Sequence, residues 1–219
     1  AHYSYAIVSD GKMALVDPAR DPMPYYEYAE SSNAAIVAVF ETHPHADFVS
    51  SHLQIHKETG ATIYVSKLLG ADYPHKTFDD GDSLSMGKLL FKAINTPGHS
   101  PDSITIIATD KHSKNAMFTG DTLFVGDVGR PDLREKVGNM KAKREELASS
   151  MYHTIQSKYS HLSDDTLVYP AHGAGSLCGS NLGGESSSTL GNERRTNWAF
   201  KNLTEEEFVK HLLSDQPFV

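Results

Sequence analysis

The heptapeptide Thr42-His-Pro-His-Ala-Asp-Phe48 carries two imidazoles and a carboxylate within five residues. It follows residues 34–40 (AAIVAVF), an apolar run with the length of a buried strand, and overlaps residues 46–60, whose apolar positions fall roughly at helical spacing. We therefore expect the histidines on a strand-to-helix turn, where side chains converge and a helix N-terminus offers N–H donors to an anion. These groups bind a divalent ion only if further ligands come from elsewhere in the chain.

Three further apolar runs each end in a potential ligand. The runs are residues 89–95, 116–118 and 166–169, and the motifs that follow them are Thr96-Pro-Gly-His99, Thr119-Gly-Asp121 and Pro170-Ala-His172. A single histidine after a strand is more often a hydrogen-bonded structural residue than a ligand. Four such strand ends in one chain indicate a metal site, because they can meet at one edge of a sheet.

The four motifs T-H-P-H-A-D, T-P-G-H, T-G-D-T-L-F and P-A-H-G, in this order, resemble those of the metallo-β-lactamase superfamily, and the resemblance extends to about residue 200. It implies an α+β fold, an αββα sandwich with the metal site at one edge of its two sheets. Within the superfamily, residues 120–133 and 170–179 resemble the persulfide dioxygenases, above all the bacterial kind fused to a rhodanese sulfurtransferase domain.

Phe48 departs from the pattern of the two-metal hydrolases in this superfamily. Their motif continues H-x-H-x-D-H, and the last histidine helps to hold the second ion, whereas a phenylalanine cannot ligate. We therefore predict a single metal. The fused persulfide dioxygenases tend to carry phenylalanine there, so Phe48 also argues against a glyoxalase II or a lactamase.

The resemblance implies that His43, His99 and Asp121 are the metal ligands and the catalytic residues. Two imidazoles and one carboxylate form the facial triad of mononuclear non-haem Fe(II) oxygenases, with three positions left for substrate sulfur, O₂ or water. We expect one Fe(II) per chain. Zinc can occupy the same ligands, but it has no redox chemistry and would leave only hydrolysis.

The remaining motif residues, His45, Asp47 and His172, lie next to the ligands by the same resemblance. There we expect their hydrogen bonds to orient the ligands or the substrate. The alternative is that they are remnants of a two-metal site. We favour the first interpretation, because a buried aspartate without partners would be costly.

Two residues are candidates for substrate binding. Arg130, in Gly129-Arg-Pro-Asp132, matches the family's Gly-Arg-x-Asp segment, where the arginine helps to hold the thiol substrate, and a guanidinium suits a carboxylate or phosphate. The alternative is a structural pair with Asp127 or Asp132. Cys178 follows His172 in a loop of small residues. One interpretation is that its thiol accepts or passes on sulfur; the alternative is that the thiol is inert.

Several other features are expected to lie outside the metal site itself. We expect the pair His52 and His56 to lie on a solvated helix face rather than bind zinc. Arg194 and Arg195 add positive charge at the pocket rim or are solvated. Residues 125–138 and 173–191, rich in glycine and other small residues, are expected to form loops that wall the pocket.

Local patterns predict the remaining elements. Asp10-Gly-Lys12 between two apolar segments predicts a hairpin, and residues 22–31 predict a helix opened by proline. A long helix is expected over residues 140–158, and another over 204–214, where Thr204 and Glu207 form a capping box.

Composition narrows the function classes. The 219 residues, 39% hydrophobic, are enough for one domain over residues 1–219, and a rhodanese domain would follow it in a longer parent protein. The formal charge of −8 argues against a nucleic-acid partner. No run approaches the ~20 apolar residues of a membrane span, and the single cysteine fits a reducing, cytoplasmic location. A homo-oligomer is compatible with the sequence.

The sequence thus predicts a non-haem Fe(II) dioxygenase that oxidises the sulfane sulfur of a low-molecular-weight thiol persulfide, such as glutathione persulfide, with O₂ to sulfite and thiol. One alternative is a zinc-dependent thioester hydrolase of glyoxalase II type that uses His43, His45, His99 and Asp121. Another is a catalytically silent binding module that has kept the fold.

Overall fold

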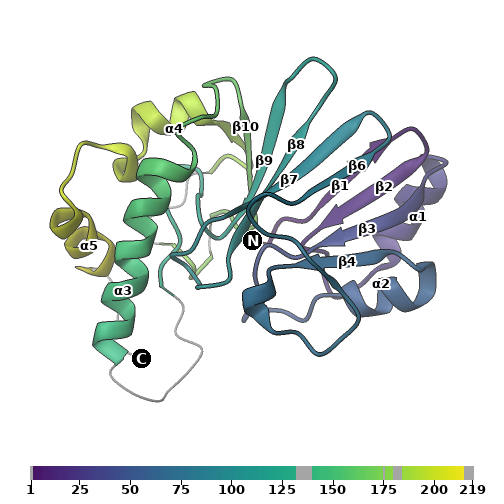
Figure 1. Ribbon diagram of the computed structural model, residues 1–219, viewed down its shortest axis with the longest axis horizontal. Helices are drawn as coiled ribbons and strands as arrows, with labels where there is room; N and C mark the ends of the chain where they lie inside the picture. Colours follow the sequence, from purple (N-terminus) through teal and green to yellow (C-terminus); the bar gives the residue numbers. More distant parts are fainter. Residues whose placement is uncertain (1, 132–139, 175, 180–183, 215–219) are drawn as a thin grey trace.

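The computed structural model describes residues 2–131, 140–174, 176–179 and 184–214, with side chains of the helix that begins at residue 140 described from residue 143 onward. Two β-sheets face each other in the middle of the molecule, and helices cover both outer faces (Figure 1). These layers confirm the expected αββα sandwich. The single-domain span of residues 1–219 stays a prediction.

The first sheet has the order β1-β2-β3-β4-β5. The β1–β2 hairpin is antiparallel, as the Asp-Gly turn predicts, and the other pairs are parallel. Its strands are β1 (Tyr5–Ser9), β2 (Lys12–Val16), β3 (Ala35–Phe40), β4 (Thr62–Val65) and β5 (Lys76–Thr77).

The second sheet has the order β11-β10-β9-β8-β7-β6. Its neighbours are antiparallel apart from β9 and β10, which run parallel. Its strands are β6 (Ser83–Met86), β7 (Leu89–Asn95), β8 (Ile104–Thr109), β9 (Asn115–Gly120), β10 (Leu167–Pro170) and β11 (Ser188–Thr189).

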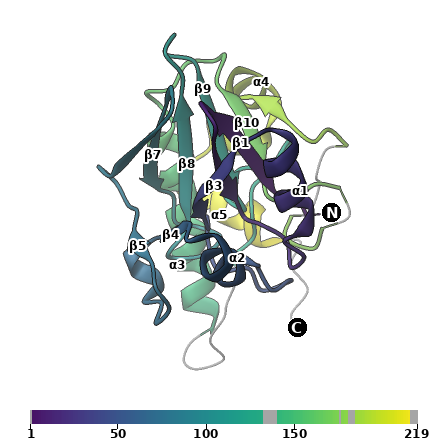
Figure 2. The same cartoon turned by 90° about the vertical axis from the view of Figure 1, so that its right-hand side faces the viewer.

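Helices close the two outer faces. Figure 2 shows α1 (Met23–Ser31) and α2 (His52–Thr59) in front of the first sheet. On the far side of the second sheet lie α3 (Met140–His153), α4 (Leu190–Thr196) and α5 (Glu205–Ser214). A π-helical turn, Thr154–Lys158, continues α3, and short 3₁₀ turns occupy Lys67–Leu69 and Trp198–Phe200.

Strand β2 shows why the sandwich has separate cores. Met13 and Leu15 pack towards the helices, whereas Ala14 and Val16 pack between the sheets. Successive side chains of a strand point to opposite faces, so an uninterrupted apolar run is what a strand buried on both sides requires. A third core joins the second sheet to α3 and α5.

Two expectations about local structure are wrong. The helix after the heptapeptide begins at His52, not at residue 46, and Val49, expected inside it, is 69% exposed. In the intervening segment Asp47 is bound by His172 from far along the chain and Ser50 by Glu41, and these contacts outweigh helical periodicity. The loop expected over residues 173–191 ends early, because β11 and the first residues of α4 lie within it.

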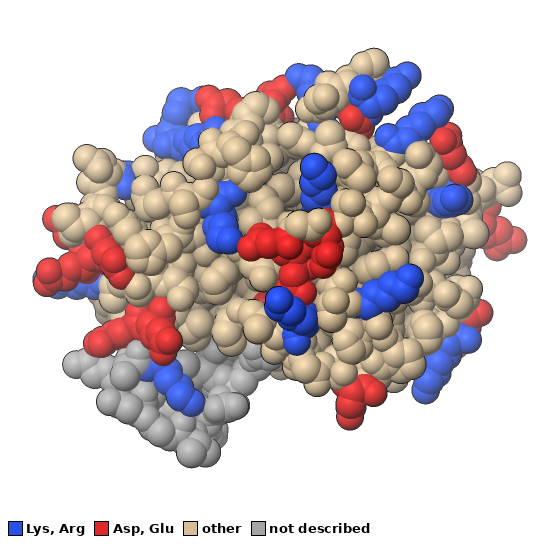
Figure 3. All heavy atoms as spheres, in the orientation of Figure 1, with Lys and Arg blue, Asp and Glu red and all other residues tan. Residues whose placement is uncertain are grey.

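The described part of the chain contains no helix with both the length and the apolar character needed to cross a membrane. On the face shown in Figure 3, lysine and arginine side chains are interspersed with aspartate and glutamate.

Candidate metal centre

The four motifs meet at one edge of the sandwich. Because β9 and β10 run parallel, Asp121 and His172, which follow them, emerge at the same edge. The carbonyl oxygen of Thr42 accepts a hydrogen bond of 2.8 Å from the Ile104 N–H, which ties the segment of His43 to the second sheet. Strand β9 ends at Gly120 with φ +55°, and a Cβ there would lie 2.4 Å from Thr42 Oγ1. Only glycine permits this close approach.

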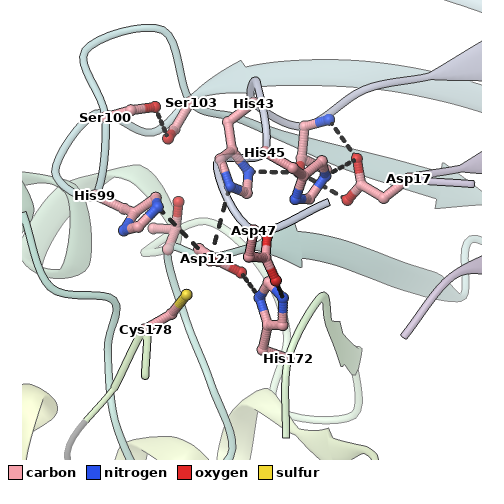
Figure 4. A network of polar contacts seen from close by, with 12 residues as sticks. Asp17, His43, His45, Asp47, His99, Ser100, Ser103, Asp121, His172 and Cys178 are labelled. Carbon is pink, nitrogen blue, oxygen red and sulfur yellow. Dashed lines mark hydrogen bonds and ion pairs between the residues drawn. The ribbon is translucent and has the colours of Figure 1, made fainter. Parts of the chain in front are cut away.

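His43, His99 and Asp121 form the central group. Their ligand atoms all lie within 4.8 Å of one another, and the three residues are at most 5% exposed. Asp121 Oδ2 is 3.7 Å from His43 Nε2 and 3.6 Å from His99 Nε2 (Figure 4). These separations are too long for hydrogen bonds and suit three donors around one ion.

The donor atoms themselves fit a divalent ion. Asp121 Oδ2 is buried and has no hydrogen-bond partner among the described residues. Burial opposes ionisation of this carboxyl, but the surrounding imidazoles hold the pKa of Asp121 well below its usual range. Burial, reinforced by neighbouring His45, lowers the pKa of His43, which is therefore neutral, as a metal ligand must be.

Hydrogen bonds fix the orientation of both imidazoles. His99 Nδ1 lies 2.6 Å from the carbonyl oxygen of Arg130 and donates to it. His43 Nδ1 lies 3.0 Å from Thr42 Oγ1, whose hydroxyl donates to Asp17 Oδ2 at 2.7 Å. Each ring therefore carries its proton on Nδ1 and directs the lone pair of Nε2 towards Asp121.

His172 and Asp47 contact the other side of Asp121. His172 Nδ1 is 2.6 Å from Asp121 Oδ1, and its Nε2 is 2.8 Å from Asp47 Oδ2. Burial lowers the pKa of His172, but the two carboxylates outweigh this and raise it. Two of the three expected neighbours, His172 and Asp47, thus lie where they can orient Asp121 (Figure 4).

One ring nitrogen of His45 faces two buried acids. Its Nε2 lies 3.0 Å from Asp17 Oδ1 and 3.7 Å from Glu41 Oε2. Burial opposes protonation, but Asp17 outweighs it and raises the pKa of His45 to about 9. His45 thus groups with Asp17 and Glu41, whose ligand atoms lie within 4.8 Å of its own, and its Nδ1 is buried with no hydrogen-bond partner among the described residues.

Arg130 and Cys178 adjoin the centre through backbone contacts. The Arg130 N–H donates to the carbonyl oxygen of Cys178 at 2.9 Å. The Cys178 sulfur forms a second group with Asp121 and His172, whose ligand atoms lie within 4.8 Å of one another. Burial and the Asp121 carboxylate raise the pKa of this thiol to about 12. Asp132, one expected partner of Arg130, lies outside the described residues.

Other sequence candidates lie elsewhere. Arg194 binds Asp164 at 2.6 Å and the carbonyl oxygen of Tyr159 at 2.9 Å, so it is held in an ion pair, and Arg195 is exposed. His52 Nδ1 faces Glu41 at 3.3 Å and His56 Nδ1 binds the carbonyl oxygen of Ala61, so these two histidines do not converge.

Three contributing residues escaped the sequence analysis. Asp17, Glu41 and Thr42 are all buried beside the histidines. Asp17 is signalled only by the Asp-Pro pair that directly follows β2. Glu41 precedes the heptapeptide and Thr42 is its first residue, and nothing in these residue types indicates buried partners.

The family model described as the metallo-beta-lactamase superfamily matches residues 1–172. This chain therefore belongs to the metallo-β-lactamase superfamily. The human mitochondrial persulfide dioxygenase ETHE1 is 30% identical over 198 residues, which cover 90% of this chain and 69% of the human protein. A hydroxyacylglutathione hydrolase from Tolumonas auensis is also 30% identical, over 76% of this chain and 59% of the relative.

Two solved structures share the fold closely. A metallo-beta-lactamase from Staphylococcus aureus superposes with a TM-score of 0.88 at 34% identity, covering 100% of this chain and 70% of that one. The structure of ETHE1 from Myxococcus xanthus gives 0.81 at 28% identity, with 99% and 87% covered. The relatives include both a dioxygenase and a hydrolase, so superfamily membership alone does not define the reaction.

Proposed function

We propose that this chain is a mononuclear non-haem Fe(II) persulfide dioxygenase acting on a low-molecular-weight thiol persulfide such as glutathione persulfide. The observation that carries the proposal is the unpartnered Asp121 Oδ2, which faces Nε2 of His43 and of His99. Two imidazoles and one carboxylate are the donor set of the Fe(II) facial triad. The similarity to persulfide dioxygenases supports the choice of substrate.

Bound Fe(II) supplies the redox chemistry for O₂, which the side chains lack. In the overall reaction the S–S bond of the persulfide breaks. The terminal sulfur gives four electrons to O₂ and takes both of its oxygens, and a third oxygen comes from water. The products are sulfite and the free thiol, which keeps one proton, and the remaining protons pass to solvent.

In this proposal the protein's residues hold the metal and orient the groups that bind it. His43, His99 and Asp121 hold the metal, Thr42 and the Arg130 carbonyl group fix the two rings, and His172 fixes the carboxylate. The Arg130 guanidinium binds a carboxylate of the thiol carrier. Cys178, protonated at neutral pH, contacts the substrate sulfur as a neutral thiol.

Metal analysis combined with oxygen uptake tests the proposal. Protein made with ample iron should hold one iron per chain and consume O₂ on addition of glutathione persulfide, with sulfite formed. Asp121→Ala should abolish both iron retention and O₂ uptake. Turnover of persulfide by that variant would remove Asp121 from the ligand set, and a bridged pair of ions would overturn the mononuclear assignment.

A zinc-dependent thioester hydrolase remains the second candidate, because hydroxyacylglutathione hydrolases are among the relatives. Zinc retention with turnover of S-lactoylglutathione, and no O₂ uptake, would favour it. Failure to retain any metal after anaerobic reconstitution with iron would instead favour a silent binding module.

A further inference from the structure

We propose that Thr154 and Tyr159 are positioning residues for the metal centre. Thr154 begins the π-helical turn that continues α3, and Tyr159 directly follows this turn. Through these two side chains the helix holds the segments of His99 and Asp121 at a fixed separation. The inference rests on the proposed function, which makes His99 and Asp121 ligands. Neither Thr154 nor Tyr159 is among the residues proposed to bind the metal or the substrate.

The π-helical turn accounts for the direction of both side chains. In an α-helix, residues five apart differ by about 140° around the axis and point to different neighbours. A π-turn closes its hydrogen bonds between residues five apart, which brings such residues to nearly the same side. Thr154 and Tyr159 are five apart and both buried, whereas Gln156 and Ser157 between them are exposed. The turn therefore directs both hydroxyl groups into the protein.

Thr154 holds the segment that leads to His99. Its hydroxyl donates a hydrogen bond of 2.7 Å to the carbonyl oxygen of Pro97, two residues before the ligand. Three residues earlier on the helix, Met151 packs so closely on Gly98 that a Cβ there would lie 2.7 Å from Met151 Cβ. The backbone before His99 thus lies directly against the helix, and a directed hydrogen bond fixes it there.

Tyr159 belongs to a cluster of four buried hydroxyl groups. Its Oη lies 2.8 Å from Thr105 Oγ1, which is 3.1 Å from Thr96 Oγ1. Thr96 Oγ1 is in turn 3.2 Å from Thr122 Oγ1, and the Thr122 hydroxyl donates to the Thr96 carbonyl oxygen at 3.2 Å. All four side chains are fully buried, so their hydroxyl groups depend on one another for hydrogen bonds.

The hydroxyl cluster connects the two ligand segments. Thr96 opens the motif that ends in His99, and Thr122 directly follows Asp121. The contact between these threonines therefore helps to set the 3.6 Å separation of His99 Nε2 and Asp121 Oδ2. Burial raises the pKa of Tyr159, so its hydroxyl keeps its proton at neutral pH. Removing this hydroxyl would leave the buried threonines one partner short, which costs stability and order.

Co(II) in place of iron reports on the ligand positions, because its visible absorption depends on the geometry of the ligands around it. Thr154→Val and Tyr159→Phe remove the two hydroxyl groups and nearly preserve the side-chain shapes. The double variant should bind Co(II) about 10-fold more weakly in competition with a chelator, and its absorption bands should shift. Each single variant should show a smaller change in the same direction, and the single variants decide if the double variant does not fold.

Tyr152→Phe is the matched control for Tyr159→Phe, because the Tyr152 hydroxyl, on the same helix, donates to the Leu203 carbonyl oxygen at 3.2 Å. Thr166→Val is the control for Thr154→Val, since the Thr166 hydroxyl is buried with no hydrogen-bond partner among the described residues. Both controls should keep the Co(II) affinity and spectrum of the unmodified protein. Urea unfolding of the metal-free variants measures any loss of stability separately.

Unchanged Co(II) affinity and spectrum in the folded Thr154→Val or Tyr159→Phe protein would overturn the role of that residue. An equal change in Tyr152→Phe would also overturn the inference, because it would trace the effect to a general loss of stability. Failure of the unmodified protein to bind Co(II) through His99 and Asp121 would instead overturn the proposed metal centre.

Discussion

His172 and Asp121 are joined by a 2.6 Å contact between Nδ1 and Oδ1, which leaves Asp121 Oδ2 alone to face the two ligand imidazoles. The other ring nitrogen of His172 is held at 2.8 Å by Asp47. A side chain fixed at both nitrogens fixes the plane of the carboxylate. In the proposed centre, His172 therefore orients Asp121 without binding the metal itself.

His172→Ala should weaken metal binding by about 10- to 100-fold without abolishing it, the usual effect of losing a residue that orients a ligand. Competition of the protein with a chromophoric chelator for Zn(II) measures the change. His112→Ala, in an exposed loop, is the control and should bind as the unmodified protein does. Complete loss of binding in His172→Ala would make His172 a ligand.

Arg130→Met should separate substrate binding from metal binding. The Arg130 backbone holds His99 and Cys178, and these contacts do not need the guanidinium. Iron content should be unchanged, whereas kcat/KM for glutathione persulfide should fall about 10- to 100-fold through loss of a charge-assisted hydrogen bond. Exposed Arg195→Met should have no effect. Loss of iron from Arg130→Met would contradict the assigned role.

Gly129→Ala should disturb both fold and metal centre. A Cβ at Gly129 would lie 1.7 Å from the Asp121 carbonyl oxygen and 3.1 Å from His99 Cβ. We expect the free energy of unfolding to fall by about 3 kcal/mol or more, with weaker metal binding. Gly184→Ala, where nothing lies within 4 Å, should stay within about 1 kcal/mol of the unmodified protein in urea unfolding. Equal stability of both variants would contradict this close packing.

The sequence predicts the sandwich and its central group well because those features depend on local order along the chain. Each proposed ligand comes shortly after an apolar run, and β3, β7 and β9 are found where those runs lie. Motif order then defines which strand ends meet. The short strands β5, β6 and β11 escaped prediction, since two to four residues carry too little periodicity.

The direction of His45 could not be predicted in the same way. Its position in the heptapeptide makes it equivalent to His43, and the structure groups it instead with Glu41 and with Asp17, which is 28 residues earlier in the chain. The late start of α2 has a similar cause, because Asp47 is bound by His172 from across the chain. Contacts between distant residues override local pattern at these places.

Glu193 gives the last prediction, a dependence of stability on pH. Its carboxylate is fully buried on α4 and accepts hydrogen bonds of 2.8 and 3.3 Å from the Gly126 N–H, at the loop that leads to Arg130. Burial raises the pKa of Glu193 above its ordinary value of 4.5. The folded state therefore binds this proton more tightly than the unfolded state does.

The stabilising contribution of Glu193 is thus fully present below pH 4.5 and is lost as pH rises through the raised pKa of the folded state. Glu193→Gln keeps an acceptor for Gly126 and does not titrate. Its free energy of unfolding, relative to the unmodified protein, should increase from about pH 4 to about pH 8 in urea titrations. Glu27→Gln, at an exposed position on α1, should show no such trend. A difference that stays constant over this range would mean that Glu193 titrates alike in the folded and unfolded states.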